Sequence, residues 1–418
     1  MNAQFPPKRY SHQATAWQPP LSEHFTTSHW QFPQNDTVFF CDLHADADAF
    51  LRSLKASYLI SQTSSLGKIT LTTQGLSTNI IIGGDCFDKG PSNLKLLSLM
   101  GQLRQQGAHL ILLAGNHDIR IYAGLLALDH PNDPKQSHFF TRMGRKTSAL
   151  FAEIFQTYFI DAGLTAKDLS ALSNSEIKQA LFPATDWAEH FSQQAKNHLT
   201  PSEFTKEIRQ IAFKQTDFLN ACQEKGLNLQ QVYWAVHKAR ELFISAQGDF
   251  SWFFQELALL HREGSYLFCH AGLDDRITHW IKTRSIEQVN THFKTQLQQG
   301  DLFNIYYNEF GNVFRTKYRT TDKPLTHKGA ATLKSMGIYA IVNGHRSHEN
   351  GQQLYGRNGL LNFECDTQLN ANCRQKSQMT TPGFSATLFY SNGVVSAICS
   401  ELPHIKMFDP RYLHQRLA

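Results

Sequence analysis

The chain has 418 residues, of which 41% are hydrophobic and 18% charged, and its formal net charge is +5. This composition fits a soluble globular protein with a large core, and the small, scattered charge does not suggest a nucleic-acid partner. There is no signal-peptide core and no run of about 18 apolar residues, so we expect a cytoplasmic location and no membrane partner. The seven cysteines include no C-x-x-C pair, so we expect buried apolar side chains rather than a zinc or redox site.

Residues 1–35 contain several prolines, which predict a weakly ordered N-terminal extension, with order beginning at Thr37. Short runs of β-forming residues then predict strands at 37–41, 79–82, 109–113, 266–269, 338–342 and 360–363. Helical segments alternate with them, one at 48–54 and another starting at Pro91. This alternation predicts a layered α/β fold with its ligand site beyond the carboxyl ends of the strands. A hairpin is expected at 384–398.

Between Asp118 and Cys269 the chain carries helix signals and few strand signals, over a length typical of a small domain. Thr200-Pro201-Ser202-Glu203 is a capping box with proline at the first helical position. Apolar residues at helical spacing predict an amphipathic helix at 229–243. We therefore expect a helical cap insertion at 125–261, between core segments 36–124 and 262–418.

Five polar clusters follow the predicted strands, each where a run of β-forming residues ends. In Asp42-Leu43-His44 the two polar side chains lie two residues apart on an extended chain, so they can face one cation together. Taken alone, this pattern is more typical of a capped turn. Asp46 and Asp48 suit a helix start, where negative charge meets the positive end of the helix dipole.

The second cluster runs from Gly84 to Gly90. Asp85 follows two glycines whose missing side chains let a metal or phosphate approach, and its carboxylate could bridge two metals. Asp88 could accept a hydrogen bond from a histidine, and Lys89 could present its ammonium to a phosphate. Alone, this cluster would indicate a glycine-rich turn with solvated charges.

The third cluster places Asn116 and His117 before Asp118. An asparagine carbonyl is a neutral oxygen ligand, and His117 could donate a proton to a leaving-group oxygen while Asp88 fixes its tautomer. The alternative is a strand-to-helix cap, and for Asp118 we expect that role.

His270 and His345 form the last two clusters, each closing an apolar strand beside a glycine. A single histidine in such a place is more often structural. Two of them, downstream of three compatible clusters, favour metal ligands, because carboxylate, imidazole and amide groups together suit two adjacent divalent metals. The joint pattern predicts a metal-dependent hydrolase.

In this order the motifs D-x-H, G-D-x-x-D-x-G, G-N-H-D, H-A-G and G-H resemble those of the calcineurin-like metallophosphoesterase superfamily, and most of all its phosphoprotein phosphatase branch. The stretch 84–91 is similar to the G-D-x-x-D-R-G-P motif of that branch. The resemblance covers residues 37–118 and 266–400 and leaves out the cap. It implies a four-layer αββα metallophosphoesterase sandwich of the α/β (α+β) class.

The resemblance also implies a phosphoric ester hydrolase in which a hydroxide held by two divalent metals attacks phosphorus directly. It implies six metal ligands: Asp42, His44, Asp85, Asn116, His270 and His345. Asp42, His44 and Asp85 would bind one metal. Asp85 would also bind the other, together with Asn116, His270 and His345. His117 and Asp88 would form the proton-donating pair. We expect manganese, although iron, zinc and others suit the same ligands.

Three departures from the family pattern affect this assignment. Lys89 stands where the branch has arginine, which replaces a bidentate fork by a point charge and holds phosphate differently or more weakly. Ala45 follows His44 where the family usually has glycine. The second histidine of G-H-x-H is absent, so His348 is not an obvious ligand. Arg315 is our candidate for a second phosphate-binding arginine, with a surface position as the alternative.

The expected substrate is a phosphomonoester, either a small molecule or a phosphoprotein. One alternative is dinucleoside polyphosphate hydrolysis, since 115–120 and 270–273 also resemble the symmetrical dinucleoside tetraphosphate hydrolases. A phosphodiesterase is another. An alternative of a different class is a non-catalytic scaffold that keeps the fold, although such a protein would be expected to have lost ligands. The sequence leaves the oligomeric state open.

Overall fold

The computed structural model describes residues 14–17, 29–63, 68–164, 172–196 and 199–411. Its strands are β1 (Ala14–Ala16), β2 (Thr37–Phe40), β3 (Ile60–Thr63), β4 (Ile69–Leu71), β5 (Asn79–Ile82), β6 (His109–Leu112), β7 (His261–Glu263), β8 (Tyr266–Phe268), β9 (Ala340–Asn343), β10 (Gln353–Arg357), β11 (Leu360–Glu364), β12 (Ser385–Phe389), β13 (Val395–Cys399) and β14 (Ile405–Phe408). A seven-stranded sheet has the order β1-β14-β13-β12-β2-β5-β6, and a five-stranded sheet has the order β10-β11-β9-β8-β7.

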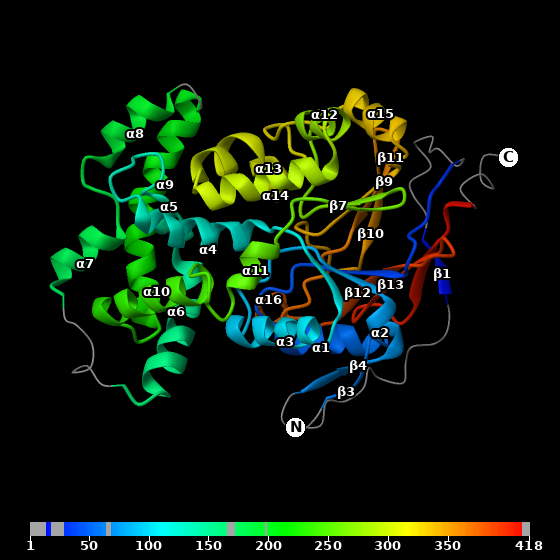
Figure 1. Ribbon diagram of the computed structural model, residues 1–418, viewed down its shortest axis with the longest axis horizontal. Coiled ribbons are helices and arrows are strands. Elements are labelled where there is room, and N and C mark those ends of the chain that lie inside the picture. Colours follow the sequence, from blue (N-terminus) through cyan, green and yellow to red (C-terminus); the bar gives the residue numbers. More distant parts are fainter. Residues whose placement is uncertain (1–13, 18–28, 64–67, 165–171, 197–198, 412–418) are drawn as a thin grey trace.

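Helices flank both sheets. Those outside the long insertion are α1 (Ala47–Ala56), α2 (Thr73–Ser77), α3 (Asn93–Gln105), α4 (Asn116–Leu126), α12 (Asp275–Thr283), α13 (Ile286–Gln299), η5 (Asn304–Glu309), α14 (Gly311–Arg315), α15 (His327–Ser335) and α16 (Ala371–Lys376). Figure 1 shows α1 and α3 along one outer face of the sheets and α12, α13 and α15 along the other.

The side-chain alternation of β2 explains this layering. Val38 and Phe40 face the core shared with α1 and α3, whereas Phe39 points into the core between the sheets. There its ring lies 5.6 Å from the ring of Phe268 on β8. Because successive residues of a strand point to opposite faces, one apolar strand serves both cores. The expected αββα sandwich is confirmed.

Pairing directions bring the functional strands to one edge. In the larger sheet β2 pairs in parallel with β5, and β5 with β6. In the smaller sheet β8 pairs in parallel with β9. The carboxyl ends of these five strands therefore point the same way within each sheet, which is where α/β folds place their ligand sites.

A long helical insertion separates β6 from β7. After α4 it contains η1 (Ala127–Asp129), α5 (Phe139–Met143), η2 (Arg145–Thr147), α6 (Ser148–Phe155), η3 (Gln156–Ile160), α7 (Asn174–Leu181), α8 (Trp187–Ala195), α9 (Pro201–Glu224), α10 (Leu229–Phe243) and α11 (Ser251–Glu256). We call these elements the helical insertion. They extend away from the sheets on one side of the molecule (Figure 1). The insertion is confirmed, while the limits 125–261 stay a proposal.

Several local predictions about helix caps, helix faces and cysteine burial are confirmed. Thr200 caps α9 by accepting a hydrogen bond from the Glu203 amide, with Pro201 as the first helical residue. The helix α10 buries the expected apolar face, which includes Val232 and Val236. Six of the seven cysteines are buried, and none of the seven forms a disulfide bond. None of the described helices is both long and apolar enough to span a membrane.

Other boundaries differ from the sequence prediction. The helix expected at Pro91 begins at Asn93, because the Ser92 hydroxyl accepts from the Lys95 amide and makes Ser92 the cap. Within the expected N-terminal extension, β1 pairs in parallel with β14, and Trp17 packs edge-on against Phe363. The prolines around these residues interrupt any strand pattern in the sequence, and the strand that pairs with β1 is distant in the chain. Residues 1–13 and 18–28 of the predicted extension lie outside the described residues.

Candidate metal centre

The structure brings the six predicted metal ligands together at the common edge of the two sheets. Asp42 and His44 follow β2, Asp85 follows β5, and Asn116 opens α4 after β6. His270 and His345 follow β8 and β9. The side chains of the aspartates and of His44 and His270 are almost fully buried.

The backbone of these loops is strained. Seven non-glycine residues here have positive φ angles between 43° and 67°: Asp42, His44, Ala45, Asp85, Asp88, Lys89 and His345. Such conformations are uncommon for residues with a Cβ atom and concentrate at functional sites. Gly84, at φ +85°, has a further constraint, since a Cβ atom there would lie 2.9 Å from Nδ1 of His270. Tight turns thus aim several polar side chains at one point.

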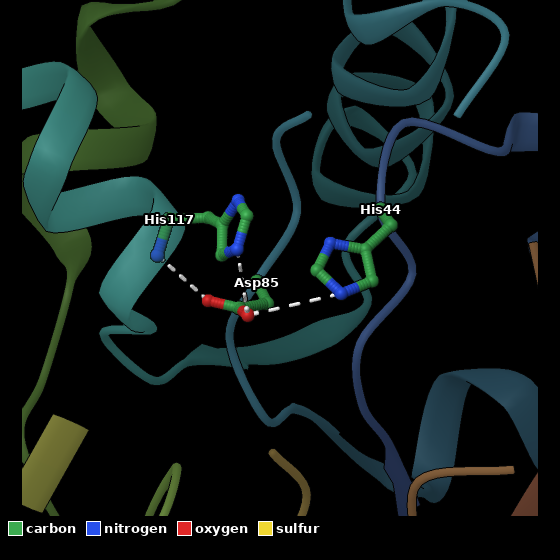
Figure 2. Close-up of side chains that lie close together, drawn as sticks. All are labelled: His44, Asp85 and His117. Atoms are coloured by element: carbon green, nitrogen blue, oxygen red, sulfur yellow. Dashed lines mark hydrogen bonds and ion pairs between the residues drawn. The ribbon is translucent and has the colours of Figure 1, made fainter. Parts of the chain in front are cut away.

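Asp85 lies at the centre of the cluster. Its Oδ2 is 3.8 Å from Nε2 of His44 and 3.9 Å from Nε2 of His117, and both rings direct this nitrogen at the carboxylate (Figure 2). Its Oδ1 is 3.4 Å from Nε2 of His270. Two groups able to hold a cation share this carboxylate, one with His44 and His117 and the other with His270 and His345. A carboxylate shared in this way could bridge two neighbouring metals.

Asp42 joins the two groups from the side of β2. Its Oδ1 lies 3.7 Å from Nε2 of His44, and its Oδ2 accepts a hydrogen bond of 2.8 Å from the backbone amide of His345. Burial raises the pKa of Asp42 well above its ordinary value, and the charges of Asp366 and Asp85 raise it further. A cation bound here would favour the ionised form of Asp42.

Backbone carbonyls fix the histidine tautomers. Nδ1 of His44 donates to the carbonyl of Phe87 over 3.2 Å, and Nδ1 of His270 donates to the carbonyl of Gly83 over 2.8 Å. Each Nε2 then keeps a lone pair directed into the cluster, as in histidines that bind metals. Burial, followed by the charge of Lys89, lowers the pKa of His44 well below its ordinary value, which favours the neutral ring.

The atoms around Asn116 indicate whether the cluster fits a cation. Its Oδ1 lies 3.2 Å from Nε2 of His270, so an acceptor faces a lone pair. With the amide reversed, its nitrogen would instead donate to His270 and, over 2.9 Å, to Nδ1 of His345. The buried Nε2 of His345 has no hydrogen-bond partner among the described residues. Converging acceptors of carboxylate, amide and imidazole type are a donor set for divalent cations, so the residues fit the metals.

His117 and Asp88 are in contact, as the sequence predicted. Nδ1 of His117 donates to Oδ2 of Asp88 over 2.9 Å. Arg120 donates from Nη2 to the same oxygen over 2.9 Å, and this Nη2 lies 2.6 Å from Nδ1 of His117. Burial and then the charge of Arg120 lower the pKa of His117 to about 4. The motifs of the sequence did not identify Arg120, although its position three residues after His117 on a helix could have indicated it.

The two predicted phosphate-binding residues differ in placement. Nζ of Lys89 lies 2.7 Å from Nε2 of His44, so its ammonium reaches the cluster. Nε of Arg315 donates to the carbonyl of Gly311 over 3.0 Å, and its guanidinium lies 3.9 Å from the ring centroid of Tyr306. The ammonium of Lys89 thus reaches the six predicted ligands, whereas the described contacts of Arg315 are with Gly311 and Tyr306.

Asp118 and Asp46 occupy the capping positions that the sequence suggested. Asp118 accepts from the backbone amide of Gly115, over 3.0 Å, and also from those of Asp85 and Cys86, both over 2.8 Å. It therefore supports the loop that carries Asp85 as well as its own helix. Asp46 caps α1 by accepting from the Ala49 amide.

Comparisons with known proteins give fold likenesses only. No family model and no curated protein matches the chain. A solved cold-active protein tyrosine phosphatase aligns at 16% identity and a TM-score of 0.45 over 89% of this chain and 78% of its own. A second such phosphatase, from a psychrophilic Shewanella species, aligns at 14% identity and a TM-score of 0.43 over 89% of this chain and 80% of its own. A protein provisionally named a diadenosine tetraphosphatase aligns at 11% identity and a TM-score of 0.32 over 88% of this chain and 96% of its own. Likenesses this weak carry no argument about activity.

Proposed function

We propose that this protein is a metal-dependent phosphoric ester hydrolase that acts on phosphomonoesters, including those of phosphoproteins. The observation that carries the proposal is the position of Asp85, whose two carboxylate oxygens face separate groups of histidines. Two divalent cations held there, manganese first among them, would activate water and stabilise both the attacking and leaving oxygens of an in-line displacement.

Each residue of the metal cluster has a distinct role in this proposal. Asp42, His44 and Asp85 hold one cation, and Asp85 also joins Asn116 in holding the other. His270 and His345 complete the second set. These six residues follow five strands at the common edge of the two sheets, which supports a site whose groups are arranged before any substrate binds.

The remaining polar groups handle the proton and the phosphate. His117 supplies a proton to the leaving oxygen, and Asp88 orients its ring through the hydrogen bond to Nδ1. Arg120 keeps Asp88 ionised through its own hydrogen bond to that carboxylate. Lys89 provides a positive charge for a phosphate oxygen, because its ammonium already reaches the cluster.

The test is hydrolysis of p-nitrophenyl phosphate by chelator-treated protein to which manganese is returned, with bound metal counted in parallel. We expect activity to return as about two metals bind per chain. Asp85→Asn should bind less metal and lose turnover. The matched control is Asp48→Asn, since the Asp48 carboxylate is exposed and pairs only with Lys95 at 2.8 Å among the described contacts. Full metal binding without turnover of any phosphomonoester would contradict the proposal.

A further inference from the structure

A carboxylate of the helical insertion caps a core helix next to the loop that carries Asp88. Glu153 belongs to α6, which packs against α3, and its side chain lies at the N-terminus of α3. Its Oε2 accepts from the backbone amide of Asn93 over 2.8 Å, and its Oε1 accepts from that of Leu94 over 3.2 Å. The hydroxyl of Ser92 donates to the same Oε1. The first amides of a helix have no partner within the helix, so a carboxylate bound there makes strong, charge-assisted hydrogen bonds.

Asn93 connects this carboxylate to Asp88. The Asn93 side chain is buried, and its Nδ2 donates to Oε2 of Glu153 over 3.2 Å. Its Oδ1 accepts from the backbone amide of Asp88 over 3.0 Å. Asp88 has a φ angle of +65°, an uncommon conformation that persists only where the surroundings hold it. Since Asp88 accepts the hydrogen bond from Nδ1 of His117, these contacts connect α6 to the ring of the proton donor.

The residue before Asp88 is held by the insertion as well. Phe87 is fully buried, and its ring centroid lies 5.6 Å from that of Phe243 on α10. The ring centroids of Phe253 and Phe254 on α11 lie 5.5 and 5.6 Å away, and the second of these rings is stacked on Phe87. Aromatic pairs in such arrangements attract each other beyond the effect of burial alone. A polar contact and an aromatic contact, independent of each other, thus join this loop to the insertion.

We propose that the helical insertion positions the proton-donating pair, and that Glu153 is a positioning residue that acts through Asn93 on Asp88. The carboxylate fixes the Asn93 amide so that its Oδ1 faces the Asp88 backbone, and Asp88 in turn orients the ring of His117. This inference rests on the proposed function, because the pair has a catalytic task only in a hydrolase. It assigns the insertion a part in turnover, which the motifs of the core do not reveal.

The first test is Glu153→Gln in protein loaded with manganese. An amide keeps one acceptor oxygen but turns its NH2 group towards other donors, so its hold on Asn93 should weaken. We expect kcat for p-nitrophenyl phosphate to fall by about tenfold, the effect of one hydrogen bond, with KM and bound metal unchanged. General unfolding would lower bound metal as well as kcat. The matched control is Glu189→Gln, an exposed residue of α8 in the same insertion, which should leave kcat unchanged.

Asn93→Ala breaks only the last link. It removes the acceptor for the Asp88 amide but leaves the backbone amides of residues 93 and 94 bound to Glu153, so α3 stays capped. We expect the same fall in kcat, by about tenfold. Because both residues act through Asp88, neither substitution should lower kcat by this factor again when combined with Asp88→Asn. Asn93→Ala also tests the proposal if Glu153→Gln does not fold.

A second readout does not require turnover. The proton on Nδ1 of His117 is hydrogen-bonded to Asp88, so it should give a downfield proton NMR signal in chelator-treated protein. The signal is identified by its absence in His117→Ala. We expect this proton to exchange with water several-fold faster in Glu153→Gln and Asn93→Ala than in Glu189→Gln, because a carboxylate that is held less firmly releases it more often.

The outcomes separate this inference from the proposed function. Unchanged kcat in both variants, or losses that multiply in full with that of Asp88→Asn, would overturn the positioning role while turnover by the unaltered protein upholds the hydrolase. Faster exchange in a protein that hydrolyses no phosphomonoester would support the positioning of His117 and overturn the proposed function. Unchanged exchange in such a protein would overturn both.

Discussion

His117 donates a hydrogen bond from Nδ1 to Oδ2 of Asp88 over 2.9 Å, and both side chains are buried. The bond fixes the ring so that Nε2 faces Asp85, at 3.9 Å from its Oδ2. A proton carried by that nitrogen is therefore directed at the centre of the cluster. The pair is built from separate strand ends, so it depends on the fold and not on sequence proximity.

Asp88→Asn should lower kcat by about tenfold to a hundredfold, because an amide holds the histidine ring less well and does not stabilise its charged form. Metal content should stay unchanged, since Asp88 faces His117 and Arg120. Steady-state kinetics with metal analysis of the same sample check this. Loss of metal in this variant would show that Asp88 acts as a ligand instead.

Arg120→Met should shift the pH dependence of turnover. Burial, followed by the charge of Arg120, lowers the pKa of His117, so removing this cation should raise that pKa. The limb of the pH profile that is due to His117 should then move to higher pH, by about one unit. Arg120→Lys keeps the charge and should move the limb less. A profile of kcat against pH for the three proteins measures the shift, and coincident profiles would exclude an influence of Arg120 on His117.

Much of the site could be predicted because its residues end parallel strands. The carboxyl ends of β2, β5 and β6 meet by pairing, so Asp42, Asp85 and Asn116 had to lie close once those strands were recognised. The strands themselves were visible as uniformly apolar runs. Local capping signals such as that of Thr200 could also be predicted, because each depends on only a few neighbouring residues.

The contacts that the sequence did not reveal join elements far apart in the chain. Arg120 on α4 donates to Asp88, which follows another strand, and only the fold brings these two side chains together. The packing of the Arg315 guanidinium on the ring of Tyr306 was likewise not visible in the sequence. The strand β1 was missed because its partner, β14, comes at the other end of the chain.

Asp85→Asn and His117→Ala should separate a bridging ligand from a proton donor. Asp85 faces both histidine groups, so its loss should reduce bound metal as well as turnover. His117→Ala should mainly lower kcat, by about a hundredfold or more, and leave bound metal close to that of the unaltered protein. Metal counting and kinetics on both variants give the comparison. Full turnover in both would refute the assigned roles.

Lys89→Ala should weaken phosphate binding. The ammonium of Lys89 reaches Nε2 of His44, so it is positioned for an anion that enters the cluster. We expect KM for p-nitrophenyl phosphate and the inhibition constant for inorganic phosphate both to rise by about tenfold, as one charged hydrogen bond is lost. Lys95→Ala is the control, because this exposed lysine pairs with Asp48 at the surface. Unchanged constants would remove Lys89 from phosphate binding.

Glu364→Gln should change how stability depends on acid. Burial would raise the pKa of Glu364, but His348, Arg346 and Arg357 outweigh it and lower the pKa from 4.5 to about 2. A carboxyl group with a depressed folded-state pKa stabilises the protein above pH 4.5, and this contribution is lost as pH falls from 4.5 through 2. The shift corresponds to about 3 kcal/mol.

Urea unfolding of chelator-treated protein at several pH values measures this contribution. The free energy of unfolding of the unaltered protein should exceed that of Glu364→Gln at neutral pH, and the difference should shrink as the pH falls. Glu256→Gln serves as control, because Glu256 pairs with Arg104 at the half-exposed surface, where such a pair is worth about 1 kcal/mol or less. Parallel curves for the unaltered protein and Glu364→Gln would mean that the buried carboxylate does not stabilise the strand that carries it.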